Sequence, residues 1–187
     1  MSPPRRNPLP APDLNPFSYV VLALVGRGGA GPHDIVDMMR RGGRVHWAAA
    51  PSKIYAEPKR LAGLGYLEAQ KAPGRTRDRT VYSLTDRGEE ALRTWLAEPS
   101  GFPRIQSEAI VRLLAGDLGD EAALRASLVA MRLELDELDD LLAASRARAA
   151  ELPHRERYLR LIGSLGQRLV DAHREWLDEV EAELGGG

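Results

Sequence analysis

The hydrophobic pattern of the N-terminal half consists of three short apolar segments, at 19–24, 35–39 and 54–64, each bounded by glycine or proline. The first segment fits a buried helix or a strand, because periodicity does not separate the two over so few residues. The third repeats its apolar positions at helical spacing and ends at Gly65, a residue typical of helix C-termini. We therefore expect a series of short elements before residue 65.

The next segment alternates in the manner of β-structure. Residues 66–71 and 80–84 are β-prone and flank a loop that contains Pro73 and Gly74, which predicts a hairpin. Thr85 then suits a helix N-cap. The order helix, helix, helix, hairpin, helix is that of a winged helix-turn-helix, whose third helix enters the major groove and whose hairpin is the wing.

The C-terminal half has a different period. A row of apolar residues recurs at spacings of 4, 3, 4, 3 and 4, typical of a coiled-coil-like helix. A second long helix is predicted after Pro153, with its own apolar face. Because such rows are hard to bury in a monomer once the N-terminal half has its own core, we expect them to hold a homodimer together. The predicted dimerisation residues are Leu124, Leu128, Met131, Leu135, Leu138 and Leu142 on the first helix, and Leu159, Ile162, Leu169, Trp176 and Val180 on the second.

These patterns predict a mainly α fold with a small β-hairpin wing: a winged helix-turn-helix followed by long antiparallel C-terminal helices. We expect a flexible Pro-rich arm at 1–15, a DNA-binding domain at 16–99, and a helical dimerisation domain at 100–187 that ends in a flexible glycine tail.

Charge is distributed unevenly over a chain whose formal net charge is −1. Residues 1–99 hold 15 Lys and Arg against 10 Asp and Glu, whereas residues 100–187 hold 11 against 17. Between Arg40 and Arg79 there are ten basic residues and three acidic ones. Such a distribution indicates that the N-terminal half meets a polyanion.

DNA binding by this architecture needs cationic or amide groups on the third helix and phosphate contacts beside it. Alternate residues of a hairpin strand point the same way, so three arginines would line one surface of the wing, although a solvated hairpin tip is the plainer interpretation of that run alone. Pro58 predicts a bend or an irregular first turn in the third helix. The candidate DNA-binding residues are Ser52, Lys53, Tyr55, Ala56, Lys59 and Arg60 on the helix, and Arg75, Arg77 and Arg79 on the wing.

The glycines of Gly26-x-Gly28-x-x-Gly31 have the spacing of a dinucleotide-binding loop. That motif also requires a second parallel strand and an acidic residue about 20 positions later. Neither is present around His46, so we interpret the glycines as a tight turn between helices.

The sequence gives little support for disulfides, metal sites, membrane segments or catalytic sites. The absence of cysteine excludes disulfides and thiolate metal sites and fits a reducing cytoplasm. The four histidines lack the spacing of a metal site. No apolar run approaches the roughly 20 residues that span a bilayer, and the start is not typical of a signal peptide. We therefore expect no enzyme activity, cofactor, metal or membrane contact. Trp176 is expected to pack in a core or interface, the alternative being a cavity for an aromatic effector.

Two runs resemble the PadR family of transcriptional regulators: WAAAPSKIYAEPKRLAGLGYL at 47–67 and YSLTDRGEEAL at 82–92. The spacing from Pro103 to Glu108, followed by two long helices, is similar to the dimerisation region of longer members. The resemblance implies a homodimeric repressor of bacterial type that binds a short inverted repeat of double-stranded DNA. Some members release DNA on binding small, often aromatic molecules.

The chain departs from the family pattern at two places. Pro32-His33 replaces a Gly-Tyr pair at the start of the second helix, and the proline that often follows the third-helix tyrosine is absent at Ala56, with one at Pro58 instead. The alternative function is a winged helix used only for protein–protein interaction, which would have no need of the basic helix and wing.

Overall fold

The computed structural model describes residues 13–43, 46–47, 49–73, 78–103 and 105–185. The chain divides into two compact units: Met1–Arg40 with Ala48–Phe102, and Arg41–Trp47 with Pro103–Gly187. Helices dominate both units, and the described strands form one antiparallel pair. The predicted fold class, mainly α with a small hairpin wing, is confirmed.

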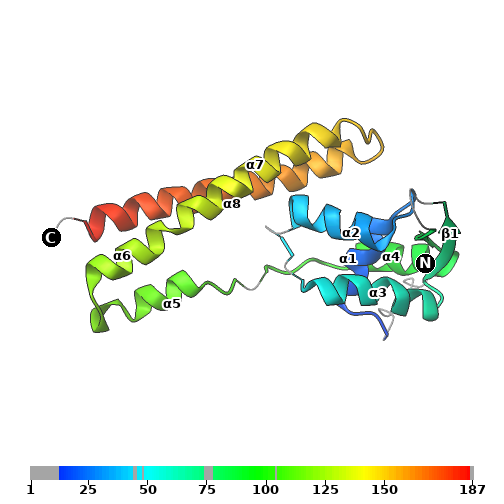
Figure 1. The fold of residues 1–187 in the computed structure, drawn as a ribbon, viewed down its shortest axis with the longest axis horizontal. Helices are drawn as coiled ribbons and strands as arrows, with labels where there is room; N and C mark the ends of the chain where they lie inside the picture. The colour runs from blue at the N-terminus through cyan, green and yellow to red at the C-terminus, as the bar shows by residue number, and fades with distance from the viewer. Residues whose placement is uncertain (1–12, 44–45, 48, 74–77, 104, 186–187) are drawn as a thin grey trace, which may run out of the picture. The chain divides into compact units, whose positions relative to one another are not determined.

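The first unit follows the predicted order of elements. A π-helical turn, η1 (Met39–Gly43), follows its second helix. The strands pair in a register that runs from Leu67 opposite Leu84 to Ala72 opposite Arg79. The elements are α1 (Pro16–Val25), α2 (Pro32–Met38), α3 (Pro51–Gly63), β1 (Leu67–Ala72), β2 (Arg79–Leu84) and α4 (Asp86–Leu96), as Figure 1 shows.

The glycine-rich segment connects α1 to α2. Gly26 and Gly29 have φ angles of 49° and 69°, a region in which glycine lacks the steric cost of other residues. Ala30 then pairs with Tyr82 of β2, with N–H to carbonyl distances of 2.9 and 3.0 Å. Because the segment before the glycines is helical and the strands are antiparallel, the prediction of an interhelical turn is confirmed. The bridge to the wing was not predicted.

The first core lies between α1, α2, α3 and the hairpin. Its fully buried side chains include Leu22, Ile35 and Leu61. Thr85 caps α4 as predicted, by accepting a hydrogen bond of 3.1 Å from the N–H of Gly88. A side chain at that glycine would place its Cβ 2.2 Å from a main-chain oxygen, so the close approach of α4 to the hairpin requires glycine.

The second unit is helical throughout its described elements: α5 (Glu108–Leu114), the short 3-10 turn η2 (Gly116–Leu118), α6 (Glu121–Val129), α7 (Met131–Ala149) and α8 (Glu156–Glu183). The prediction of one continuous helix through the seven-residue repeat is wrong at Ala130, where α6 ends and α7 begins. Ala130 itself keeps helical backbone angles, with φ −56° and ψ −23°, and α6 also packs against α5 and α8.

The seven-residue repeat packs against α8 of the same chain. Leu128, Leu135 and Leu142 are 1%, 4% and 3% exposed, and they share a core with Val170, Leu177 and Val180. The remaining predicted dimerisation residues that pack partly buried against this core are Leu124, Met131, Leu138 and Trp176. Of the predicted dimerisation residues, Leu128, Leu135, Leu142 and Val180 are therefore buried within the chain, and contact of the predicted set with a second chain stays a prediction.

Figure 1 shows α7 and α8 side by side and antiparallel. Two features bring these helices together. Gly166 of α8 lies so close to Leu142 that a Cβ would sit 2.8 Å from its side chain. Arg174 of α8 also forms ion pairs with Asp136 and Asp139 of α7, at 2.8 and 2.9 Å. The close approach at Gly166 and the ion pairs of Arg174 thus fix how α7 and α8 are aligned along each other.

Candidate nucleic-acid interface

Helix α3 has one buried side and one exposed side. Pro51 occupies the first turn, where a missing N–H has no cost, and the helix continues to Gly63. Its buried residues, Ile54, Glu57, Pro58 and Leu61, recur at helical spacing. Pro58 therefore lies within the helix that runs from Pro51 to Gly63, on its buried side.

The outward side of α3 is composed of small residues and one lysine. Ser52, Ala56, Lys59 and Gly63 are all exposed and follow one another at spacings of 4, 3 and 4. Side chains this small leave room for a helix backbone to approach base edges in a major groove. Lys53 and Tyr55 are also exposed and flank this row on opposite sides.

Arg60, another predicted DNA contact, is engaged within the unit. Its guanidinium donates to both Glu57 carboxylate oxygens, at 2.6 and 2.9 Å, and to the Ser18 hydroxyl of α1 at 2.9 Å. The Ser18 hydroxyl in turn donates to Glu57 at 2.7 Å. These bonds hold the pKa of the Glu57 carboxyl below its ordinary value of 4.5, although burial opposes the shift. Arg60 therefore joins α3 to α1.

A second set of contacts anchors the chain just before α1. The hydroxyl of Tyr66 donates to the carboxylate of Asp13 at 2.8 Å, and Arg60 donates to the main-chain oxygen of Asp13 at 3.0 Å. Arg87 of α4 stacks 4.2 Å above the Tyr66 ring centroid. No local spacing in the sequence indicates this cluster, because its members lie up to 74 positions apart.

On the other flank of α3, Tyr55 meets α2. Its hydroxyl lies 3.2 Å from Nδ1 of His33, and the two rings pack edge to face with centroids 5.6 Å apart. Tyr55 is 43% exposed, so the pair is open to solvent. The histidine that departs from the family pattern thus packs against a predicted DNA-binding residue.

The wing contributes one described arginine. Arg79 begins β2, and its side chain is 59% exposed while it lies 3.6 Å from the Asp34 carboxylate of α2. Arg75 and Arg77 lie outside the described residues. The prediction that three guanidinium groups line one surface therefore stays a prediction.

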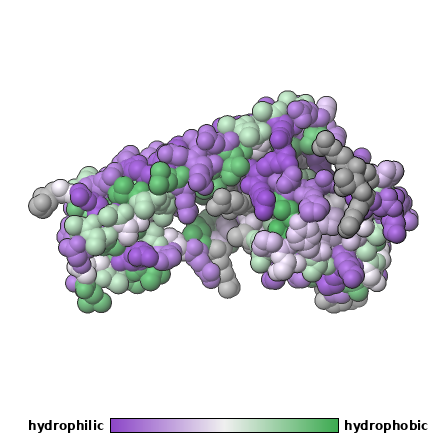
Figure 2. Space-filling model, viewed as in Figure 1, coloured by the Kyte–Doolittle hydropathy of each residue, from purple (hydrophilic) through white to green (hydrophobic). Residues whose placement is uncertain are grey.

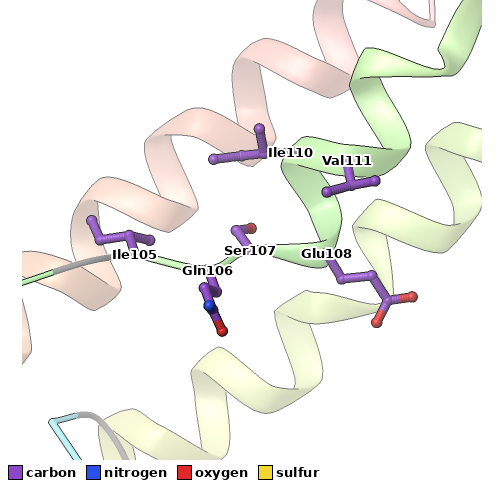
Figure 3. A pocket seen from close by; sticks show the side chains of 6 residues that line it. All are labelled: Ile105, Gln106, Ser107, Glu108, Ile110 and Val111. Carbon is purple, nitrogen blue, oxygen red and sulfur yellow. The ribbon is translucent and has the colours of Figure 1, made fainter.

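Other site types find no support in the part of the chain that the structure describes. No group of three or more His, Cys, Asp or Glu residues there could hold a metal ion. None of the helices described is both long and apolar enough to cross a membrane. In the second unit, an open recess has Ile105, Ile110 and Val111 beside Ser107, as Figure 3 shows. Glu108 at the same recess is paired with Arg112 at 2.6 Å.

Comparison with known proteins finds one family model and one curated protein that match the chain in sequence. Residues 105–185 match the family described as Virulence activator alpha C-term. The negative transcriptional regulator PadR of Bacillus subtilis (strain 168) is 29% identical over 88 residues, which are 46% of this chain and 48% of that protein. The chain thus matches about half the length of that relative in sequence.

Solved structures share the fold over most of the chain. Bacillus subtilis PadR in complex with operator DNA aligns with a TM-score of 0.73 at 20% identity, covering 92% of this chain and 97% of that one. The Vibrio cholerae virulence activator AphA aligns with a TM-score of 0.66 at 25% identity, covering 90% and 98%. PadR in complex with p-coumaric acid aligns with a TM-score of 0.64 at 21% identity, covering 90% and 96%. The predicted resemblance to PadR-family regulators is confirmed.

Proposed function

We propose that this PadR-like chain is a sequence-specific DNA-binding transcriptional regulator that acts as a homodimer on a short inverted repeat. The observation that carries the proposal is the outward side of α3, where small residues and Lys59 form an exposed row on a winged-helix unit. The operator complex of Bacillus subtilis PadR, which has this fold, supports it. In this proposal residues 16–99 bind DNA and residues 100–187 dimerise, in the cytoplasm and without enzyme activity.

The contacts divide by chemistry. Ser52 and Ala56 face base edges because they lie on the outward row near the start of α3. Lys53 and Lys59 neutralise phosphates, and Arg79 does so from the wing together with Arg75 and Arg77. Arg60 acts indirectly, since its guanidinium is held by Glu57 and Ser18.

The proposed dimer surface is an exposed apolar row in the N-terminal half of α8. Tyr158, Leu161, Ile162 and Leu165 share one helical side and are 51–63% exposed. Of the predicted dimerisation residues, Ile162 lies in this row, and half-buried Leu169 continues it one turn later. Leu159, the remaining predicted dimerisation residue of α8, is half-buried. Contiguous exposed apolar rows mark association surfaces.

A second apolar surface belongs to the same unit. On α5, Ile110, Val111 and Leu114 are 59%, 63% and 83% exposed, and Figure 2 shows hydrophobic residues at the surface around this helix and the turn after it. In this proposal the α5 row belongs to the dimer interface as well, and two-fold symmetry would present it once from each copy.

Charged residues beside the α8 row support an antiparallel arrangement of the two α8 helices in the proposed dimer. Arg157, Arg160 and Arg168 share a side of α8 and are followed on it by Asp171 and Glu175. When two copies of α8 run antiparallel, the basic end of one lies along the acidic end of the other. Such complementarity favours this orientation over a parallel one.

Release of DNA by a small molecule is a further part of the proposal. Its support is the solved complex of Bacillus subtilis PadR with p-coumaric acid. Trp176, the alternative candidate for an aromatic-ligand cavity, is half-buried against the core of the second unit, which favours a packing role.

Selection of bound duplexes from a random library tests the function. We expect enrichment of an inverted repeat, with half-sites spaced for two recognition helices. Recovery of no common sequence, together with no retention on random DNA at low salt, would contradict the proposal and favour a protein-interaction module.

A further inference from the structure

The His33–Tyr55 pair joins the two helices of the helix-turn-helix at the exposed surface. His33 is the second residue of α2, and Tyr55 flanks the outward row of α3. The hydroxyl oxygen lies 3.2 Å from Nδ1, and the rings meet at an interplanar angle of 80°. The Tyr55 hydroxyl is thus within hydrogen-bonding distance of the imidazole, while Tyr55 as a residue remains 43% exposed.

The direction of this hydrogen bond depends on the proton of the imidazole. A phenol hydroxyl carries one hydrogen, and a deprotonated Nδ1 can only accept it. When both ring nitrogens carry protons, Nδ1 donates to the phenol oxygen instead, and the hydroxyl hydrogen turns away from the ring. An outward hydroxyl can then donate to a phosphate oxygen.

We propose that His33 is a positioning residue for DNA binding, which sets the direction in which the Tyr55 hydroxyl donates. When the imidazole is protonated, the hydroxyl of Tyr55 donates to a DNA phosphate. When the imidazole is neutral and Nδ1 carries no proton, the hydroxyl donates to Nδ1 instead. The inference rests on the proposed function and assigns a role to the residue that replaces the family's tyrosine at the start of α2.

The acidic groups nearby are engaged with other partners. Asp34 accepts a hydrogen bond of 2.8 Å from the N–H of Gly31 and lies 3.6 Å from Arg79. Asp37, one turn after His33 on α2, has an interaction of its own. The titratable and charged groups on the helices packed against α2 are Tyr19 of α1, and Lys53, Tyr55, Glu57, Lys59 and Arg60 of α3. Of the acidic groups there, Glu57 is bound to Arg60 and Ser18.

Affinity measured against pH tests the assignment. The probe is a fluorescein-labelled duplex carrying the repeat enriched by selection, titrated at constant ionic strength from pH 8 to 5.5. Histidine is the side chain whose charge ordinarily changes in this interval. Because one phosphate donor is gained, we expect the wild-type affinity to rise about threefold to tenfold at pH 5.5.

Two variants and a matched control separate positioning from packing. His33→Gln keeps a polar side chain that does not titrate, and Tyr55→Phe keeps the ring without the hydroxyl, so both should bind with a flat pH profile. His154→Gln, which removes an exposed histidine from the second unit, should keep the wild-type profile. Far-ultraviolet circular dichroism at both pH values checks that each variant is folded.

A pH dependence that persists in His33→Gln would overturn the assignment. So would a dependence lost in His33→Gln but retained in Tyr55→Phe, because His33 would then act on DNA without the hydroxyl. Failure of the wild-type protein to bind the duplex at any pH would instead contradict the proposed function.

Discussion

Helices α3 and α8 each bury one side against their own unit and expose the other, but the exposed sides differ in chemistry. The row on α3 is Ser52, Ala56, Lys59 and Gly63, which suits close approach to a polyanion. The row on α8 from Tyr158 to Leu165 is apolar. Once the side of a helix that packs against its own unit is known, the residues on the remaining exposed side indicate what kind of partner the helix binds. For α3 they indicate a polyanion, and for α8 an apolar surface.

The largest expected effect comes from a charge placed on the covered side of the α7–α8 hairpin. Leu142 is 3% exposed and lies against Gly166, so Leu142→Glu would bury a carboxylate without a partner. We expect a loss of more than about 5 kcal/mol of unfolding free energy, enough to unfold the second unit. Urea denaturation followed by circular dichroism measures it. A folded variant of near wild-type midpoint would show that this side is not a core.

The same substitution on the uncovered side should leave the chain folded. Leu165 is 54% exposed, so Leu165→Glu adds a solvated charge in the monomer but places two glutamates at the proposed dimer interface. We expect the dissociation constant of the dimer to rise about 100-fold or more. Sedimentation velocity gives the mass, and Leu133→Glu, at an exposed leucine of α7 outside the proposed interface, is the control. An unaltered dimer would exclude this row as the interface.

The contrast between these two substitutions shows where sequence patterns are informative. The order of elements, the Thr85 cap and the glycine turn could be predicted, because each depends on residues adjacent in sequence. The surface against which the seven-residue repeat packs could not be predicted. Periodicity indicates that one side of a helix is buried, but it does not indicate which chain buries it. The contacts of Arg60 within its own unit could not be predicted for the same reason, because Ser18 lies 42 positions away.

Lys59 and Arg60 provide the next test, since they are adjacent residues with different expected roles. Lys59→Ala should weaken DNA binding about threefold to tenfold and reduce the slope of log affinity against log salt by about 0.9, with stability unchanged. Arg60→Ala should lower the unfolding free energy by about 1–3 kcal/mol, because it leaves the Glu57 carboxylate buried and partly unpaired. Fluorescence anisotropy and urea denaturation of both variants make the comparison. Equal losses of stability in the two variants would contradict the assignment of Arg60 to contacts within its own unit.

The smallest expected effect is the pH dependence that Glu57 gives to the first unit. Hydrogen bonds from Arg60 lower the pKa of Glu57 from 4.5 in the folded protein. The stabilisation is therefore complete above about pH 4.5 and is lost as the pH falls through the folded pKa. Glu57→Gln cannot titrate, so its unfolding free energy should be lower at pH 7 and should decline less between pH 5 and 3, by about 1 kcal/mol.

Urea midpoints of the first-unit transition, measured for both proteins across this interval, test the effect of Glu57. The carboxyls of Asp13 and Asp139 also have lowered pKa values, but both are present in each protein and cancel in the difference. Parallel curves would mean that Arg60 does not stabilise the ionised carboxylate. The inward side of α3 would then be held by packing of Ile54, Pro58 and Leu61 alone, and Arg60 would be free to contact DNA as its neighbour Lys59 is expected to do.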